Sequence, residues 1–127
     1  MAEMLQHEQL TGKIIAAAIE VHQILGPGLL ESAYATCLFR ELETRGLVCT
    51  REVLLPVQYK RMLLDCGYRL DLVVNDAVIL ELKCVSEINE LHKAQLLTYL
   101  KLSGKSVGLL LNFNVPLMKH GITRMVN

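Results

Sequence analysis

The chain has 127 residues, of which 52% are hydrophobic and three are proline, a composition that excludes disorder and fits one domain with its own core. Thirteen basic residues balance thirteen acidic ones, so the net charge alone does not indicate a nucleic-acid partner. No apolar run reaches the roughly 18 residues of a membrane span, and the start, MAEMLQHEQL, carries charges. We therefore expect a soluble, cytoplasmic protein without a membrane partner.

The charges are nevertheless divided unevenly along the chain. All acidic residues lie at or before Glu90, whereas the segment from Leu91 onward holds five basic residues and no acidic one. Two interpretations stay open: a fold whose halves complement each other in charge, or a basic flank that holds a polyanion near a metal. The four cysteines form no CxxC pair, which predicts buried, reduced thiols instead of a zinc or iron–sulfur site.

Apolar residues at helical spacing predict two helices at the start of the chain. The first covers about residues 9–25, with Thr11 as its N-cap, and a Gly-Pro-Gly sequence at 26–28 ends it. The second covers about residues 29–45 and stops at Gly46.

The period of the apolar residues then changes to two, which predicts three strands. They are CTREVLLPVQYK, with Pro56 indicating an edge position or a bulge, and then LLDCGYRLDLVV and AVILELKCV, joined at Asn75-Asp76. A helix over NELHKAQLLTYLKLSG and a buried strand, SVGLLLNF, follow; no element is assigned after Pro116. This order predicts an α/β fold in which helices flank both faces of a mixed sheet.

Charged residues interrupt two of these apolar strands. Glu81 and Lys83 are two residues apart and share one face of their strand, and Asp71 lies on the preceding strand. The loop at Asn75-Asp76 decides whether they meet, because a two-residue turn would place Glu81 on the wrong face. We predict the odd, three-residue loop, which pairs Val74 with Val78 and sets Asp71 opposite Glu81.

Two adjacent carboxylates repel each other unless a counter-charge is present. A divalent cation relieves that repulsion, and all-oxygen ligands favour Mg²⁺ or Mn²⁺. Such a site can polarise a phosphodiester, with Lys83 orienting water or stabilising charge on phosphorus. A structural alternative stays open, in which Lys83 forms a buried salt bridge with Asp71 or Glu81.

The ordered motifs resemble those of a known superfamily. Asp71 followed by Glu81-Leu82-Lys83 resembles the D…(D/E)xK signature of the PD-(D/E)XK nucleases, with Leu70 in place of the usual proline. Gln95-Leu-Leu-Thr-Tyr99 resembles the QxxxY motif of the RecB-like exonuclease branch. Nearly the whole chain is similar to the small bacterial GxxExxY proteins, whose motif matches Gly28-Leu-Leu-Glu31-Ser-Ala-Tyr34.

This resemblance implies one PD-(D/E)XK nuclease-like domain over residues 1–127, with an α-β-β-β-α-β core at about 29–113 and an additional N-terminal helix. It implies a DNA nuclease that acts as a homodimer or as the catalytic part of a larger assembly. The implied site residues are Asp71, Glu81 and Lys83 in catalysis; Asp71, Glu81, Glu31 and the Leu82 carbonyl as metal ligands; and Gln95, Tyr99 and Tyr34 as substrate or site support. A non-catalytic nucleic-acid-binding or protein-binding module on the same fold is the alternative.

A helical wheel assigns Glu31 to the buried side of its helix, because it falls within about 20° of Leu38 and Leu42. We therefore expect Glu31 to point inward as a third acidic member of the metal site. Tyr34, one turn further along, is expected to pack beside Glu31 or to donate a hydrogen bond.

Overall fold

The computed structural model describes residues 2–127, with side chains described from residue 7 onward. Three α-helices, one 3₁₀ helix and seven strands make up this part of the chain. In chain order they are α1 (Ala2–Leu25), α2 (Glu31–Thr44), β1 (Cys49–Leu54), β2 (Val57–Tyr59), β3 (Met62–Leu64), β4 (Arg69–Val74), β5 (Val78–Lys83), α3 (Glu90–Ser103), β6 (Val107–Asn112), η1 (Met118–Gly121) and β7 (Ile122–Val126).

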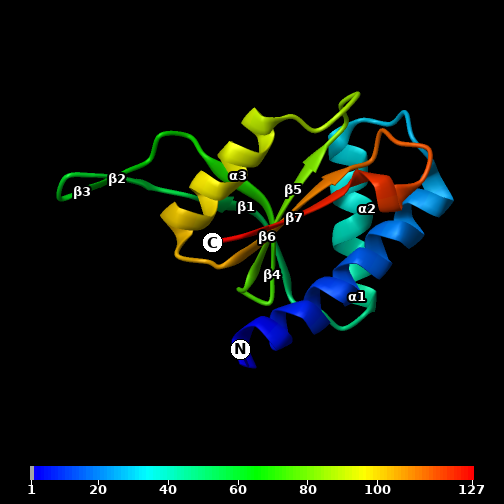
Figure 1. Ribbon diagram of the computed structural model, residues 1–127, viewed down its shortest axis with the longest axis horizontal. Coiled ribbons are helices and arrows are strands. Elements are labelled where there is room, and N and C mark those ends of the chain that lie inside the picture. Colours follow the sequence, from blue (N-terminus) through cyan, green and yellow to red (C-terminus); the bar gives the residue numbers. More distant parts are fainter. Residues whose placement is uncertain (1) are drawn as a thin grey trace.

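A five-stranded mixed sheet is the centre of the fold, with the strand order β1-β4-β5-β6-β7. Only β5 and β6 run parallel, because α3 crosses over between them. The helices α1 and α2 cover one face of the sheet, and α3 covers the other (Figure 1). The predicted α/β class with helices on both faces and an additional N-terminal helix is confirmed.

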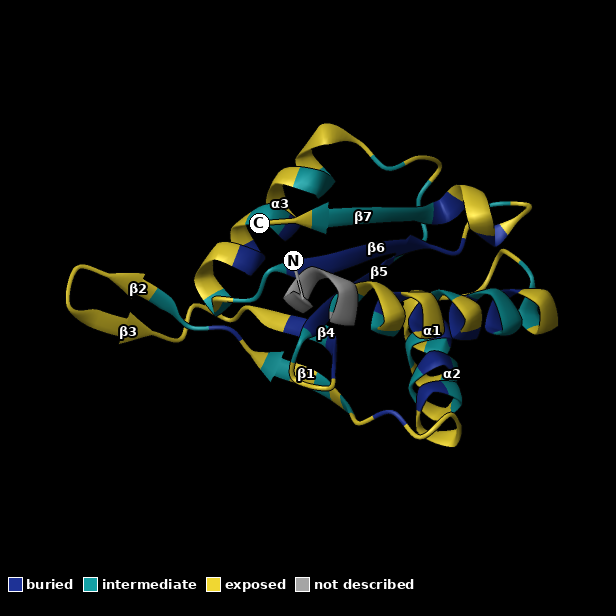
Figure 2. Cartoon of the chain, turned by 60° about the horizontal axis from the view of Figure 1, so that its bottom comes forward, coloured by how far each residue is buried: buried dark blue, intermediate teal, exposed yellow. Residues whose placement is uncertain are grey.

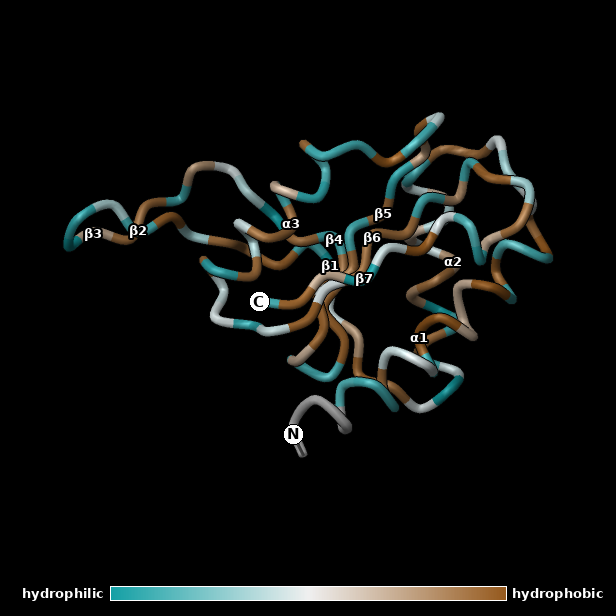
Figure 3. Tube along the Cα trace, in the orientation of Figure 1, coloured by the Kyte–Doolittle hydropathy of each residue, from teal (hydrophilic) through white to brown (hydrophobic). Residues whose placement is uncertain are grey.

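Two apolar cores follow from this three-layer arrangement. Leu72, Leu80 and Leu82 pack with residues of α1 and α2, whereas Val73 and Ile79 pack with residues of α3. Both faces of β5 and β6 are therefore buried (Figure 2), which explains why these strands are almost continuously hydrophobic (Figure 3).

The structure corrects several predicted elements. Thr11 is not an N-cap, because α1 starts at Ala2 and the Thr11 side chain donates to the Glu8 carbonyl within the helix. The segment after Pro116 forms η1 and β7, and β7 adds an antiparallel edge strand beside β6. Cys66 is exposed and the other three cysteines are half-buried, although all four are free thiols.

The largest correction concerns the first two predicted strands. Each is divided in two, because Pro56 separates β1 from β2, and a segment containing Gly67 separates β3 from β4. β2 and β3 pair only with each other and form a separate two-stranded sheet. This hairpin projects far from the body of the molecule (Figure 1).

Candidate active site

The register between β4 and β5 places the two central carboxylates side by side. Val74 pairs with Val78, and the ladder continues to Leu72 and Leu80. Asn75 and Asp76 adopt left-handed conformations, with φ of 51° and 52°. Asn and Asp tolerate left-handed backbone better than most residues and are common at tight turns. The predicted three-residue loop is therefore confirmed, and in this register Asp71 lies opposite Glu81.

The backbone ladder ends where the carboxylates begin. No paired residues follow Leu72 and Leu80, and the Asp71 side chain occupies the place of the missing backbone partner. Its Oδ2 accepts a hydrogen bond from the Leu82 N–H at 2.9 Å, and the Asp71 N–H donates to Glu81 Oε1 at 3.5 Å. Asp71 is thus held in a gap between two strands.

Burial makes this carboxylate pair electrostatically unusual. Glu81 is only 6% exposed, and desolvation together with the neighbouring Asp71 raises the pKa of Glu81 to about 9, an effect that Lys83 partly offsets. No salt bridge joins Lys83 to Asp71 or Glu81 within residues 7–127, so the ion pair required by the structural alternative is not formed. The pair lacks a fixed cation and chemically suits a hard divalent one.

On the α3 side, Tyr99 lies close to this pair. Its side chain is 8% exposed and meets the Tyr68 ring edge-on, with 5.9 Å between the ring centroids. Burial, followed by the charge of Glu81, raises the pKa of the Tyr99 hydroxyl. Gln95 is exposed and lines a groove of about 810 Å³ together with Tyr99. The two residues of the QxxxY pattern therefore share one surface beside the carboxylates.

On the α2 side, a cavity of about 260 Å³ is lined by Glu31, Asp71 and Leu82. The predicted inward orientation of Glu31 is wrong, because this side chain is exposed. The helix begins at Glu31 itself, in the turn before the first buried residue, Tyr34, and the Glu31 side chain lines the open cavity. The structure thus brings Glu31 and Asp71 to one cavity while leaving Glu31 accessible to water.

Tyr34 is a support for the start of α2 and not a surface residue. It is completely buried and stacks on Phe113, with 4.5 Å between the ring centroids. Its hydroxyl donates to the Gly26 carbonyl and accepts from the Leu29 N–H at 3.1 Å. Gly26 and Gly28 have φ of 68° and 104°, which only glycine adopts readily. The Gly-Pro-Gly loop is therefore closed by Tyr34, and Glu31 is positioned by both.

Sequence reasoning missed two residues that line the same cavity, Arg51 and Glu52. Arg51 donates to Thr36 Oγ1 at 3.2 Å and lies 5.6 Å from the centroid of the Phe39 ring. Glu52 has a φ of 51° in the middle of β1, and it lies between the pairs Arg51–Leu72 and Val53–Leu70, opposite Asp71. Side-chain alternation gives no signal for a left-handed residue at this point of a strand.

The glutamate also changes the face to which β1 directs its side chains. Before it, Cys49 packs with the α1 and α2 core; after it, Val53 and Leu55 pack with the α3 core. Arg51 and Glu52 are consecutive, yet both reach the α2-side cavity. The left-handed residue thus adds a carboxylate to the cavity that holds Glu31 and Asp71.

Three further observations concern metal ligands, the basic segment and membrane spans. Within the described residues, no three His, Cys, Asp or Glu side chains are grouped closely enough to hold a metal ion by themselves. The basic C-terminal segment is partly used in local ion pairs, since Lys93 lies 3.3 Å from Glu90 and Lys105 lies 3.0 Å from Asp76. In residues 2–127, none of the helices combines the length and apolar character of a membrane span.

Comparison with known proteins agrees with the observed fold. The sequence profile of the PD-(D/E)XK nuclease superfamily matches residues 8–125, which is nearly the whole chain. Comparison with curated proteins and with solved structures found no significant match. The match covers most of the additional N-terminal helix and the whole segment that bears Asp71, Glu81 and Lys83. The chain belongs to the PD-(D/E)XK nuclease superfamily.

Proposed function

We propose that this protein is a divalent-metal-dependent nuclease that hydrolyses phosphodiester bonds of DNA. The observation that carries the proposal is the meeting of Asp71 and Glu81 in the gap between β4 and β5. Superfamily membership implies a nucleic-acid substrate; the choice of DNA and the catalytic activity are our inference. We also propose that residues 1–127 act as one domain of the GxxExxY group, because Gly28, Glu31 and Tyr34 have connected roles at the start of α2.

Asp71 and Glu81 are the proposed first ligands of Mg²⁺ or Mn²⁺. Their oxygen atoms suit a hard cation, and the pKa of Glu81 is raised first by burial and then by the neighbouring charge of Asp71. Glu31 lines the cavity that Asp71 also lines, so it is the proposed third acidic member, and the Leu82 carbonyl is a further proposed ligand. A divalent cation held by these groups would polarise the phosphodiester and promote the formation of hydroxide from water.

The remaining residues act on the substrate or support the site in this proposal. Lys83 lies two residues after Glu81 on the same face of β5, where its ammonium group orients the attacking water or stabilises charge on phosphorus. Gln95 is exposed in the groove beside Tyr99, where it is proposed to support the site from the α3 side. Tyr99 supports the carboxylate pair, and Tyr34 supports the helix start that carries Glu31.

Cleavage of labelled single-stranded and double-stranded DNA in Mn²⁺ tests the proposal. We expect cleavage that stops on chelation and falls about 100-fold or more in Asp71→Asn and Lys83→Ala, the size of effect seen when a group that stabilises a transition state is removed. Lys101→Ala is the matched control, since Lys101 is an exposed lysine on α3 and should retain full activity. Equal cleavage by the parent, Asp71→Asn and Lys83→Ala would assign the activity to a contaminant.

The alternative function is a non-catalytic binding module on the same fold. It is favoured by the lack, within residues 7–127, of any group of three potential metal ligands. This alternative predicts that the parent protein binds DNA or a protein but cleaves no DNA in Mn²⁺ or Mg²⁺. Binding that is unchanged in Asp71→Asn and Lys83→Ala would favour this alternative.

A further inference from the structure

The hairpin of β2 and β3 carries an apolar face that nothing in the structure covers. We call residues 55–66, which contain this hairpin, the arm. Two-stranded ribbons are at best marginally stable alone in water and gain stability when an apolar face is covered. Paired residues of an antiparallel ribbon lie on the same face, so the register places Val57 with Leu64, and Tyr59 with Met62, on one entirely apolar face.

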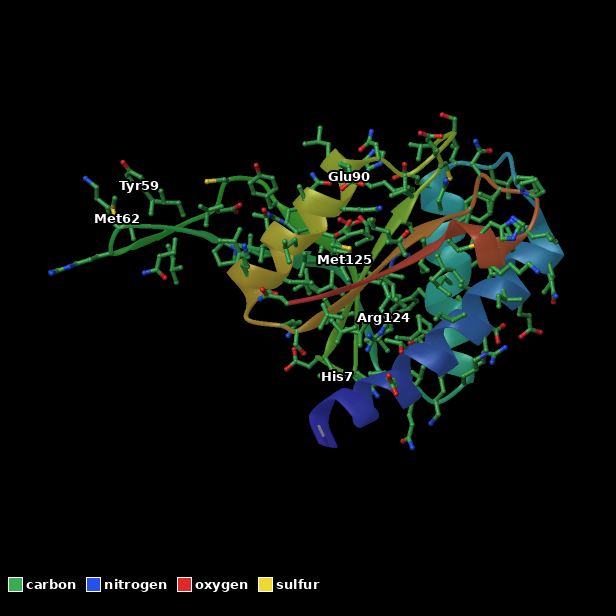
Figure 4. All side chains as sticks on the ribbon, viewed as in Figure 1. His7, Tyr59, Met62, Glu90, Arg124 and Met125 are labelled. Atoms are coloured by element: carbon green, nitrogen blue, oxygen red, sulfur yellow. The ribbon has the colours of Figure 1, made fainter. Side chains whose placement is uncertain are left out.

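The exposure of this face is high for such side chains. Tyr59 is 58% exposed, Met62 is 55% exposed and Leu64 is 39% exposed. Figure 4 shows Tyr59 and Met62 near the far end of the arm, well away from the sheet and its helices. An apolar patch of this kind on a ribbon with two free edges is typical of an interaction surface.

The same face continues into the groove that α3 forms with the base of the arm. Val57 belongs both to the apolar face and to the lining of this groove of about 810 Å³. Cys66 and Tyr68 line one wall, and Leu91 and Leu102 of α3 line the other. Leu91 is 77% exposed. We call this space the arm groove. One molecule therefore presents an apolar ribbon and, directly beside it, an apolar groove.

The charges at the two ends of this surface are opposite. The tip of the arm holds Lys60 and Arg61, which form no salt bridge within residues 7–127, and Figure 3 shows this hydrophilic tip. The exposed residues Glu87 and Glu90 lie just before Leu91, at the end of the arm groove where α3 begins. Glu90 also lies 3.3 Å from Lys93 of its own helix, whereas Glu87 forms no salt bridge within residues 7–127. Glu90 is labelled at that end of α3 in Figure 4.

We propose that two copies of this chain associate through their arms, so that the apolar face of each arm lies in the arm groove of the other copy. A twofold axis relates the two contacts, as in interfaces where the same patch is used by both subunits. The apolar faces then cover each other, and each basic tip, Lys60 and Arg61, lies near Glu87 and Glu90 of the other copy. A second copy is favoured over nucleic acid because the face from Val57 to Leu64 is apolar and only the tip is basic.

The molar mass in solution, measured by light scattering and sedimentation, tests the apolar part of this proposal. We expect the parent to be a dimer and Met62→Asp to be a monomer. Leu117→Asp is the matched control, because Leu117 is also 55% exposed but lies before η1, and it should remain a dimer. A monomeric parent, or a dimer that Met62→Asp leaves intact, overturns the proposal.

A charge exchange tests the pairing itself. Two double variants are needed, Lys60→Glu/Arg61→Glu and Glu87→Lys/Glu90→Lys. In a homodimer of either variant, like charges face each other, so the dissociation constant of each homodimer should rise about tenfold or more. An equimolar mixture restores opposite charges at both contacts of a heterodimer, and native mass spectrometry should detect that heterodimer. If both variants dimerise alone as well as the parent, the proposed pairing is wrong.

Nucleic acid is the competing occupant, and DNA binding distinguishes it. If the parent is monomeric and Lys60→Glu/Arg61→Glu loses DNA affinity, the arm binds nucleic acid and the dimer proposal is overturned. The outcome is independent of catalysis, since the proposed nuclease can fail its cleavage test while association and the charge exchange still succeed.

Discussion

A single buried hydroxyl group positions a proposed metal ligand in this protein. Tyr34 bonds to the backbone at both ends of the loop that precedes α2, at Gly26 and at Leu29. Its ring is fixed by stacking on Phe113. Because Glu31 is the first residue of α2, any loosening of this loop moves the Glu31 carboxylate relative to Asp71. The spacing of Gly28, Glu31 and Tyr34 in the sequence thus corresponds to one structural unit.

We predict that Tyr34→Phe lowers the free energy of unfolding by about 1–2 kcal/mol, because two backbone groups lose their partner while the packing of the ring is retained. Urea denaturation measures this change. Tyr59→Phe is the control, since Tyr59 is 58% exposed on the arm and its change should stay within about 0.5 kcal/mol. If both variants change the free energy of unfolding equally, the hydrogen bonds of the Tyr34 hydroxyl do not stabilise the fold.

At the scale of the element, β1 combines an ordinary pairing register with one left-handed residue. The pairs on both sides of Glu52 keep the same register against β4, yet the φ of 51° at Glu52 changes the face to which the following side chains point. Left-handed backbone costs roughly 1–2 kcal/mol for a residue with a Cβ atom. Glu52, the residue with this strained backbone, lines the cavity that Glu31 and Asp71 also line.

We predict that Glu52→Gly is more stable than Glu52→Ala by about 1 kcal/mol, because glycine adopts the left-handed conformation without steric strain. At Thr50, an exposed residue on the same strand with no positive φ, Thr50→Gly should be less stable than Thr50→Ala, because glycine weakens a strand. Thermal unfolding of the four variants measures both differences. The same order at both positions would contradict the presence of strain at Glu52.

The spacing of apolar residues correctly predicted the helices and strands in which it has a single period. It failed where the chain changes direction within an apolar run. Asn75-Asp76 located the loop between β4 and β5 but left its length open, and the observed register was predicted from the need to place Asp71 and Glu81 together. The arm was not predicted, because hydrophobic alternation continues through Pro56 although the tertiary structure separates β1 from β2. The exposure of Glu31 was missed because a helical wheel ignores how the first turn extends beyond the core.

For the whole molecule, Glu81 makes stability depend on pH in a defined direction. The folded protein keeps this carboxyl protonated up to a pKa of about 9, whereas the ordinary value is 4.5. Between these values the folded state binds more protons than the unfolded chain, so the free energy of unfolding falls as pH rises, by at most about 1.4 kcal/mol per pH unit. Burial raises the pKa of the Cys49 thiol to about 11 from 9.0, so its contribution lies above this window.

We predict that Glu81→Gln, measured by chemical denaturation between pH 5 and pH 9 in chelator, has a flatter stability profile than the parent and is more stable at pH 8, because glutamine carries no charge that must be desolvated. At pH 8, Mg²⁺ or Mn²⁺ at about 100 times its dissociation constant should stabilise the parent by about 2.7 kcal/mol and Glu81→Gln by much less, since a ligand is lost.

Parallel pH profiles for the two proteins would show that Glu81 is not protonated in the folded state. Equal stabilisation by metal would show instead that the cation binds away from Asp71 and Glu81, and the two results are independent because the first is obtained without metal.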